Sequence, residues 1–337
     1  MANQADSMPR VEENRRSVPA SFLSWARKNL NEITLLIGLI GVSAFITVNN
    51  EVFLTGPNLI NVLRSAAFLG IVTWGMTFVI TAGEIDVSLG PAVAFAAVLL
   101  GWLVTNNGIP LEIAAPLVVG VTTVVGLAAG YVRARFNVPS FVTSLALWSI
   151  YDGMKQVMSN NIPIPVENEA FAVWGRGELL GIPYVIIIAG VLFIFFAYIA
   201  KQTVYGRAVF AVGGNAKAAY AAGINVLWTR ASVFAITGAL AGLTGLLHVS
   251  RLGTATGQVA SGLEFSSIAA VVIGGTSLSG GRGTFIGSLI GVIFISVIGN
   301  GLVLMGVNSQ AQNVVRGVLI LIAVLVNVIF KRESKQI

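Results

Sequence analysis

Apolar stretches alternate with short polar ones between residues 33 and 330 of the chain. A helix needs about 20 mainly apolar residues to cross the hydrocarbon core of a bilayer. The pattern therefore predicts an all-α integral membrane domain, residues 31–331, between polar tails at 1–30 and 332–337. About ten transmembrane helices are expected, at residues 33–48, 65–82, 91–105, 113–130, 138–157, 182–200, 230–250, 265–275, 284–305 and 313–330.

Two of these spans are short, and each adjoins a polar stretch that contains glycine. GEIDVSLG (83–90) precedes one, and GGTSLSGGRGT (274–284) ends the other. Such backbone is tolerated at membrane depth only where protein or a cavity surrounds it, and in transporters it often marks the pathway. We expect broken or half-depth helices at both places, with a tight turn at the membrane face as the alternative. The residues concerned are Asp86, Ser88, Gly274, Gly275, Gly280, Gly281 and Gly283.

The stretch TVYGRAVFAVGGNAKAAYAAGINV (203–226) lies between two strongly apolar runs but is itself too polar to cross a bilayer. It carries two basic residues, Arg207 and Lys217, and four glycines. Because spans flank it on both sides, the loop 201–229 must lie on one face of the membrane. The stretch is predicted to be a docking element for a partner.

The composition supports a membrane protein. Only 10% of the 337 residues are charged and 55% are hydrophobic, whereas soluble domains carry about 25% charged residues. The net charge of +6 does not call for a nucleic-acid partner, because positive charge gathers on the cytoplasmic side of membrane proteins. With ten spans and the N-terminus inside, fourteen of the 20 Lys and Arg residues fall on inner segments, so both termini are predicted to be cytoplasmic.

Few residues offer chemistry. The absence of cysteine excludes thiolate catalysis and cysteine metal sites. The sequence LSGGR (278–282) resembles an ABC ATPase signature, but the chain has no Gly-Lys-Ser/Thr nucleotide motif, so we expect no ATPase activity. The single histidine, His248, and Ser261 leave an intramembrane hydrolase as a remote alternative.

Acidic residues in the membrane region could serve an ion-coupled secondary transporter. Glu84 and Asp86 are the best candidates for a relay. Asp86 and Ser88 also suit the N-cap of a helix that begins just before Pro91, which is the favoured interpretation. No span carries a central ladder of carboxylates. The energy for transport is therefore expected to come from outside this chain.

Several motifs together resemble the permease subunits of ribose-type monosaccharide ABC importers, over about residues 33–330. The run from Gly206 to Ile224, with AVGGN at 211–215, looks like the family's cytoplasmic loop, whose short coupling helix docks on the ATPase. GEIDVSLG resembles the family's GGIDLSVG, IAAVVIGGTSLSGGRGT (268–284) resembles its counterpart, and NVPSF (137–141) also fits. The chain departs from the pattern at Glu84, which replaces the second glycine, at Pro91 and at Lys217, where an acid is usual.

This resemblance implies a type II-like ABC importer permease of the bacterial inner membrane that moves a sugar or sugar-like solute. The implied partners are a second permease subunit, identical or related, two cytoplasmic ABC ATPase domains that hold ATP and Mg²⁺, and a periplasmic sugar-binding protein. No cofactor is expected on this chain. The sequence leaves the sugar open.

Three groups of residues follow as expectations. ATPase coupling is assigned to Tyr205, Gly206, Arg207, Phe210, Gly213, Gly214, Asn215, Lys217, Ala218, Ala219, Tyr220 and Gly223, with direct contacts from Tyr205, Phe210, Ala219 and Tyr220. Pathway lining is assigned to Asn61, Thr73, Trp74, Thr77, Ser144, Trp148 and Asn300. Arg176 and Arg251 are expected to contact acidic residues of the binding protein.

Overall fold

Helices form almost all of the structure, a computed structural model that describes residues 30–308, 310–315, 317, 318, 321 and 325. In chain order they are α2 (Leu30–Asn49), α3 (Gly56–Thr81), α4 (Leu89–Gly101), the π-helix η1 (Trp102–Asn106), α5 (Leu111–Phe136), α6 (Ser140–Ser159), α7 (Glu169–Arg176), α8 (Tyr184–Gln202), α9 (Val204–Gly214), α10 (Ala216–Ala221), α11 (Val226–Leu252), α12 (Leu263–Ile273) and α13 (Phe285–Leu304). Two antiparallel strand pairs join β1 (Ile164–Pro165) to β4 (Thr254–Ala255) and β2 (Glu178–Leu179) to β3 (Ile182–Pro183).

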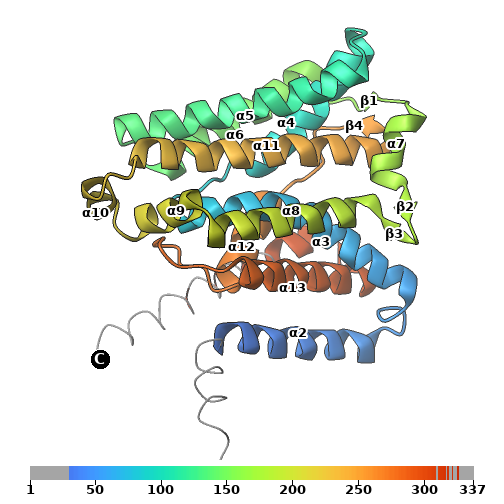
Figure 1. Cartoon of the computed structure of the whole chain (residues 1–337). Coiled ribbons are helices and arrows are strands. Elements are labelled where there is room, and N and C mark those ends of the chain that lie inside the picture. Colours follow the sequence, from blue (N-terminus) through green and yellow to red (C-terminus); the bar gives the residue numbers. More distant parts are fainter. Residues whose placement is uncertain (1–29, 309, 316, 319–320, 322–324, 326–337) are drawn as a thin grey trace, which may run out of the picture.

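The long helices lie side by side, and the short elements gather at the two ends of the bundle (Figure 1). Helix α10 lies beyond one end, which we call the α10 end. Helix α7 and the strand pairs lie at the other, the α7 end (Figure 1). The all-α membrane architecture predicted from the sequence is confirmed.

In the described part of the chain, seven helices are long and apolar enough to cross a membrane. Each of the nine predicted spans up to residue 305 coincides with a helix, but α6 is too polar and α12 too short to be among the seven. The eleven residues of α12 rise about 16 Å, half of the hydrocarbon core. The tenth span, 313–330, and the tail 1–29 fall largely outside the described residues, so the number ten stays a prediction.

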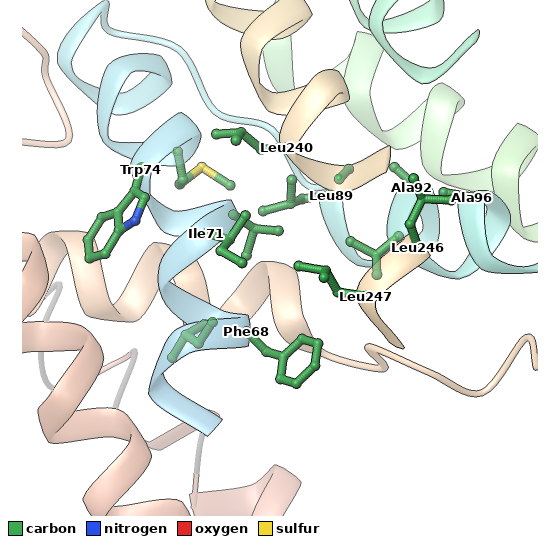
Figure 2. Close-up of a cluster of buried hydrophobic side chains, with 14 of the residues drawn as sticks. Phe68, Ile71, Trp74, Leu89, Ala92, Ala96, Leu240, Leu246 and Leu247 are labelled. Carbon is green, nitrogen blue, oxygen red and sulfur yellow. The ribbon is translucent and has the colours of Figure 1, made fainter. Parts of the chain in front are cut away.

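Helix α4 lies at the centre of the bundle, and every residue of it is buried. Figure 2 shows Leu240, Leu246 and Leu247 of α11 between the side chains of α3 and those of α4. The outer helices show the reverse pattern, because Val124 on α5 is 63% exposed and Ile194 on α8 is 69% exposed. A helix that is apolar all round is buried, whereas these exposed apolar faces suit contact with lipid.

Glycines allow α5 and α11 to pack backbone against backbone. A Cβ atom at Gly238 would lie 2.2 Å from the Thr122 carbonyl oxygen, and one at Gly126 would lie 2.4 Å from that of Phe234. The small residues at 238 and 242 therefore serve packing within the chain, as their spacing predicts for close helix contact in lipid.

Candidate coupling site and interrupted helices

Three side-chain caps divide the stretch between α8 and α11 into short helices. The hydroxyl of Thr203 accepts the backbone N–H of Gly206, and the amide oxygen of Asn215 accepts that of Ala218. Asn225 does the same for Trp228 at the start of α11. Between α10 and α11 the chain turns at Gly223, whose φ of +82° favours glycine. Because each cap satisfies a free N–H group at a helix start, the stretch forms α9 and α10 instead of one long helix.

These two helices expose one set of predicted coupling residues and bury another. Lys217 and Ala218 are exposed, and Tyr220 is 76% exposed. Ala219 is buried, and Phe210 packs against the hydrophobic core. Of the four residues predicted to contact the partner directly, Tyr220 is the most exposed, and the contact itself stays a prediction. Also exposed are Arg207, Gly214, Asn215 and Gly223, whereas Gly206 is buried and Gly213 half-buried.

Tyr205 faces the permease interior. Its hydroxyl lies 2.9 Å from the Ser232 hydroxyl on α11, and its ring lies 5.9 Å from that of Phe78 on α3. Burial raises the pKa of Tyr205 to about 12, and the hydrogen bond to Ser232 lowers it by a smaller amount. The phenol therefore joins α9 to α3 and α11 as a neutral group.

Glycine-rich stretches from three parts of the chain meet at the α10 end. The backbone N–H of Gly281 donates to the Thr81 carbonyl at the end of α3 over 2.8 Å. A Cβ at Gly213, at the end of α9, would lie 1.8 Å from that same carbonyl oxygen. A Cβ at Gly280 would lie 2.7 Å from the Gly83 Cα. The sequence predicted these glycines as two separate groups, and the structure joins them in one junction.

Both interrupted stretches are now defined. The stretch 274–284 is a compact turn in which Ser277 N–H donates to the Arg282 carbonyl over 2.9 Å and Gly275, Gly280 and Gly281 have positive φ. Gly274 packs on the backbone of Gly287, and Gly283 lies against Thr276. The α3–α4 connection, residues 82–88, instead passes between helices, and Asp86 and Ser88 within it are buried. The second stretch thus follows the eleven-residue helix α12 as a turn, and the first is a buried connection between two helices. A place in the pathway stays a prediction for both stretches.

Two serines of α6 hold the backbone of the α3–α4 connection. The hydroxyls of Ser140 and Ser144 accept the N–H groups of Ile85 and Val87 over 3.1 and 3.2 Å. Residues four apart on a helix are separated by about 6 Å, close to the length of two residues of extended chain. Because these two lengths are similar, alternate N–H groups of the connection reach serines on successive turns of α6.

The acidic side chains of the connection are also bound. Asp86 Oδ1 accepts the N–H and the hydroxyl of Ser88, and its Oδ2 accepts the Thr237 hydroxyl of α11. Ser88 occupies the N-cap position of α4, but its hydroxyl donates to Asp86 and does not cap the helix. Asp86 thus binds the N-cap residue itself and α11, and the side-chain cap that the sequence favoured is not formed at the start of α4.

Glu84 forms a buried cluster with two arginines, which sequence reasoning missed. Its Oε2 lies 2.7 Å from Arg133 Nε at the end of α5. Its Oε1 lies 2.8 Å from Arg230 Nε on α11, an ion pair rather than an aligned hydrogen bond. Arg230 is the first residue of the predicted span 230–250, and in the structure it lies near the start of α11 at the α10 end. No local pattern could have paired residues this far apart in sequence.

The residues predicted to line a pathway do not form one set. Thr73 and Thr77 are buried and bind Ser267 and Ser288, and the Trp74 indole donates to the Ala189 carbonyl. Ser144 holds the α3–α4 connection. In this conformation these four hold helices together, and their pathway role stays a prediction. Of the rest, Asn300 pairs with Asn58, Asn61 is exposed, and Trp148 is half-buried on α6.

The α7 end carries charged groups around a pocket of about 290 Å³. Glu167, Glu169 and Arg176 contribute to its lining. The Arg176 Nε atom donates to the Arg251 carbonyl over 2.7 Å, and the Arg251 guanidinium lies over the ring of Phe68. The structure thus brings Arg176 and Arg251 together on an exposed surface.

The geometry gives no support to the hydrolase alternative. The His248 ring stacks on Phe68, with 4.1 Å between ring centroids. Ser261 is exposed in the loop that precedes α12. The histidine thus packs in the bundle, where its nearest ring partner is apolar.

Comparisons with known proteins agree with this architecture. Residues 58–324 match the family described as "Branched-chain amino acid transport system / permease component". The chain is 46% identical over 316 residues to a probable ABC transporter permease, YphD, of Escherichia coli K12, covering 94% of this chain and 95% of that protein. It is 37% identical to the ribose import permease RbsC of Bacillus subtilis (86% and 91% covered) and 33% identical to the L-arabinose permease AraH of Azospirillum brasilense (89% and 88%). No solved structure matches.

Proposed function

The chain belongs to the family of branched-chain amino acid transport system permease components, and from that premise we propose that it is the membrane subunit of an ATP-driven sugar importer. Its relatives include permeases named for ribose, L-arabinose and xylose. A monosaccharide, or a solute that resembles one, is therefore the proposed cargo. The chain provides the membrane path, and a separate ABC ATPase supplies the energy.

The observation that carries this proposal is the capped pair of short helices α9 and α10 at one end of the bundle. Their exposed residues include an aromatic ring, Tyr220, and two basic groups, Arg207 and Lys217. An exposed short helix with an aromatic residue suits a groove on a partner protein. Through Tyr205 and Gly213, the same element packs on α3, on α11 and on the turn 274–284. A force applied to α10 therefore reaches several helices.

The remaining parts of the assembly follow from this role. We propose two ATPase domains on the α10 end, which faces the cytoplasm, and a periplasmic binding protein on the α7 end of a protein in the bacterial inner membrane. Arg176 and Arg251 are the proposed contacts for acidic residues of the binding protein. A second permease subunit, identical or related, completes the path.

An ion-coupled secondary transporter is the second candidate, because Asp86 and Glu264 are carboxyl groups buried inside the bundle. The two candidates differ in what contacts α10. Only the ATP-driven importer needs a protein partner there.

A photo-reactive amino acid in place of Tyr220 tests the proposal. Expressed in an inner-membrane host with its own ABC ATPase, the variant is expected to form a light-dependent cross-link to that ATPase. The matched control is the same replacement at Trp174, which is 56% exposed on α7, at the opposite end of the bundle. Cross-links to the ATPase at position 174 but not 220, or at neither position, would contradict the proposed docking site.

A further inference from the structure

Glu84 carries a charge into the interior of the chain. Its side chain is completely buried, while those of its partners Arg133 and Arg230 are 13% and 18% exposed. A buried charge is stable only when it is paired, and removal of one partner leaves an uncompensated charge. Glu84 therefore fixes the positions of three segments relative to one another: the α3–α4 connection, the end of α5 and the start of α11.

The start of α11 is also joined to the proposed ATPase contact by a short link. Helix α10 ends at Ala221 and α11 begins at Val226, so a link of only four residues joins them. Asn225 closes this link by capping α11. Arg230 lies one turn into α11, so a displacement of α10 acts first on the part of α11 that carries Arg230.

A second contact joins the same two segments. The Thr237 hydroxyl of α11 donates to Asp86 Oδ2 in the α3–α4 connection. Residues 230 and 237 lie on one face of a helix because they are seven positions apart, and residues 84 and 86 lie on one side of an extended chain. One face of α11 thus holds two successive acidic side chains of the connection.

The backbone of the connection is attached to a different helix. Ser140 and Ser144 of α6 hold the backbone N–H groups of Ile85 and Val87. The connection lies between α11, which it meets through side chains, and α6, which it meets through the backbone. Any movement of α11 relative to α6 must stretch or displace this connection, which leads directly into the buried helix α4.

We propose that Glu84 is a positioning residue that transmits movement of the coupling helix α10, through Arg230 and α11, to the α3–α4 connection. The inference rests on the proposed function, because it assumes an ATPase that moves α10. Glu84 stands at a position where the motif of the similar family has glycine, and a glycine there could not form these ion pairs.

Hydrogen exchange in the complete complex, with and without a non-hydrolysable ATP analogue, tests this inference. In the wild type, the nucleotide should alter exchange both in residues 204–221 and in residues 83–90, by about tenfold for the amides of Ile85 and Val87. In the double variant Glu84→Gln/Arg230→Gln, residues 204–221 should still respond, but residues 83–90 should not. The double variant keeps the net charge of the cluster and leaves only Arg133 without a charged partner, on a side chain that is 13% exposed and so can be hydrated. The response of residues 204–221 to the nucleotide serves as the check that the complex has folded.

The control is Glu112→Gln, which removes an exposed carboxylate on α5 and should behave as the wild type. The inference would be overturned if the nucleotide changed the exchange of residues 83–90 equally in wild type and double variant. It would also be overturned if, in the wild type, the nucleotide changed the exchange of residues 204–221 but not that of residues 83–90. If residues 204–221 of the wild type do not respond to the nucleotide, the proposed function itself fails. The two failures are therefore distinguishable.

Discussion

At the scale of single residues, two features hold the α10 end together: glycines that let backbones approach closely, and buried ion pairs. Gly213 lets the end of α9 approach the Thr81 carbonyl, and Gly281 donates its N–H to that same oxygen. Nearby, Glu84 neutralises part of the charge of Arg133 and Arg230 inside the bundle. Both features bring distant parts of the chain into direct contact, so both can carry movement between helices.

Replacement of Gly213 by alanine tests the glycine junction. A Cβ at this position would lie 1.8 Å from the Thr81 carbonyl oxygen, so backbone must shift at a cost of about 1–3 kcal/mol. Thermal unfolding of the detergent-solubilised protein should show this loss. Gly214→Ala is the matched control, because its Cβ would meet only the Gly281 Cα at 3.9 Å and should change stability by less than about 0.5 kcal/mol. Equal stability of the two variants would refute close packing at the junction.

At the scale of elements, α9 and α10 are a pair of capped helices between the long helices α8 and α11. Their ends are set by the caps from Thr203, Asn215 and Asn225, and the turn after α10 requires a left-handed residue at position 223. Because the caps and the turn are local, they do not depend on where the pair lies relative to the other helices. Rigid-body displacement is how packed elements switch between states.

Gly223→Arg should uncouple ATP hydrolysis from uptake while the protein still inserts into the membrane. A Cβ at Gly223 would meet nothing within 4 Å, so the effect comes from the backbone, which costs about 1–3 kcal/mol when a residue other than glycine adopts positive φ. Asparagine tolerates this conformation best, so Gly223→Asn should retain most of the coupling. The measurement is the ratio of solute imported to ATP hydrolysed in proteoliposomes. Normal ratios in the arginine variant would argue against a role for this turn.

The sequence predicts the elements better than their contacts, for physical reasons. The bilayer imposes a length on every span, so hydropathy alone locates nine helices up to residue 305. Helix α3 begins at Gly56 and not at residue 65, because polar residues such as Asn58 and Asn61 begin the helix before its apolar core. The cluster of Glu84 with Arg133 and Arg230 depends on three-dimensional packing and has no local signal.

The contacts of polar residues in the spans were likewise not predictable from the sequence. Thr73, Trp74 and Thr77 were assigned to a pathway by residue type, yet each binds another part of the bundle. A hydroxyl group at membrane depth serves equally well to hold helices together. Residue type alone cannot separate these roles.

At the scale of the whole molecule, the two ends differ in a way that fits directional transport. The α10 end gathers the coupling helices, the glycine junction and the buried charge cluster, whereas the α7 end carries an exposed charged pocket. Between them lie the buried helix α4 and the short helix α12 of eleven residues. The chain contains no nucleotide motif of its own. Energy is therefore proposed to enter at the α10 end and solute at the α7 end.

Uptake by proteoliposomes tests whether transport by this chain depends on a separate ATPase. The chain is reconstituted with its ATPase and binding protein, and the solute that copurifies with the binding protein is supplied in labelled form outside. Uptake should require ATP at the ATPase side and should continue when a proton uncoupler is present and ATP is held constant. Uptake by the purified chain alone, driven by an ion gradient without ATP, would contradict the account and identify a secondary transporter.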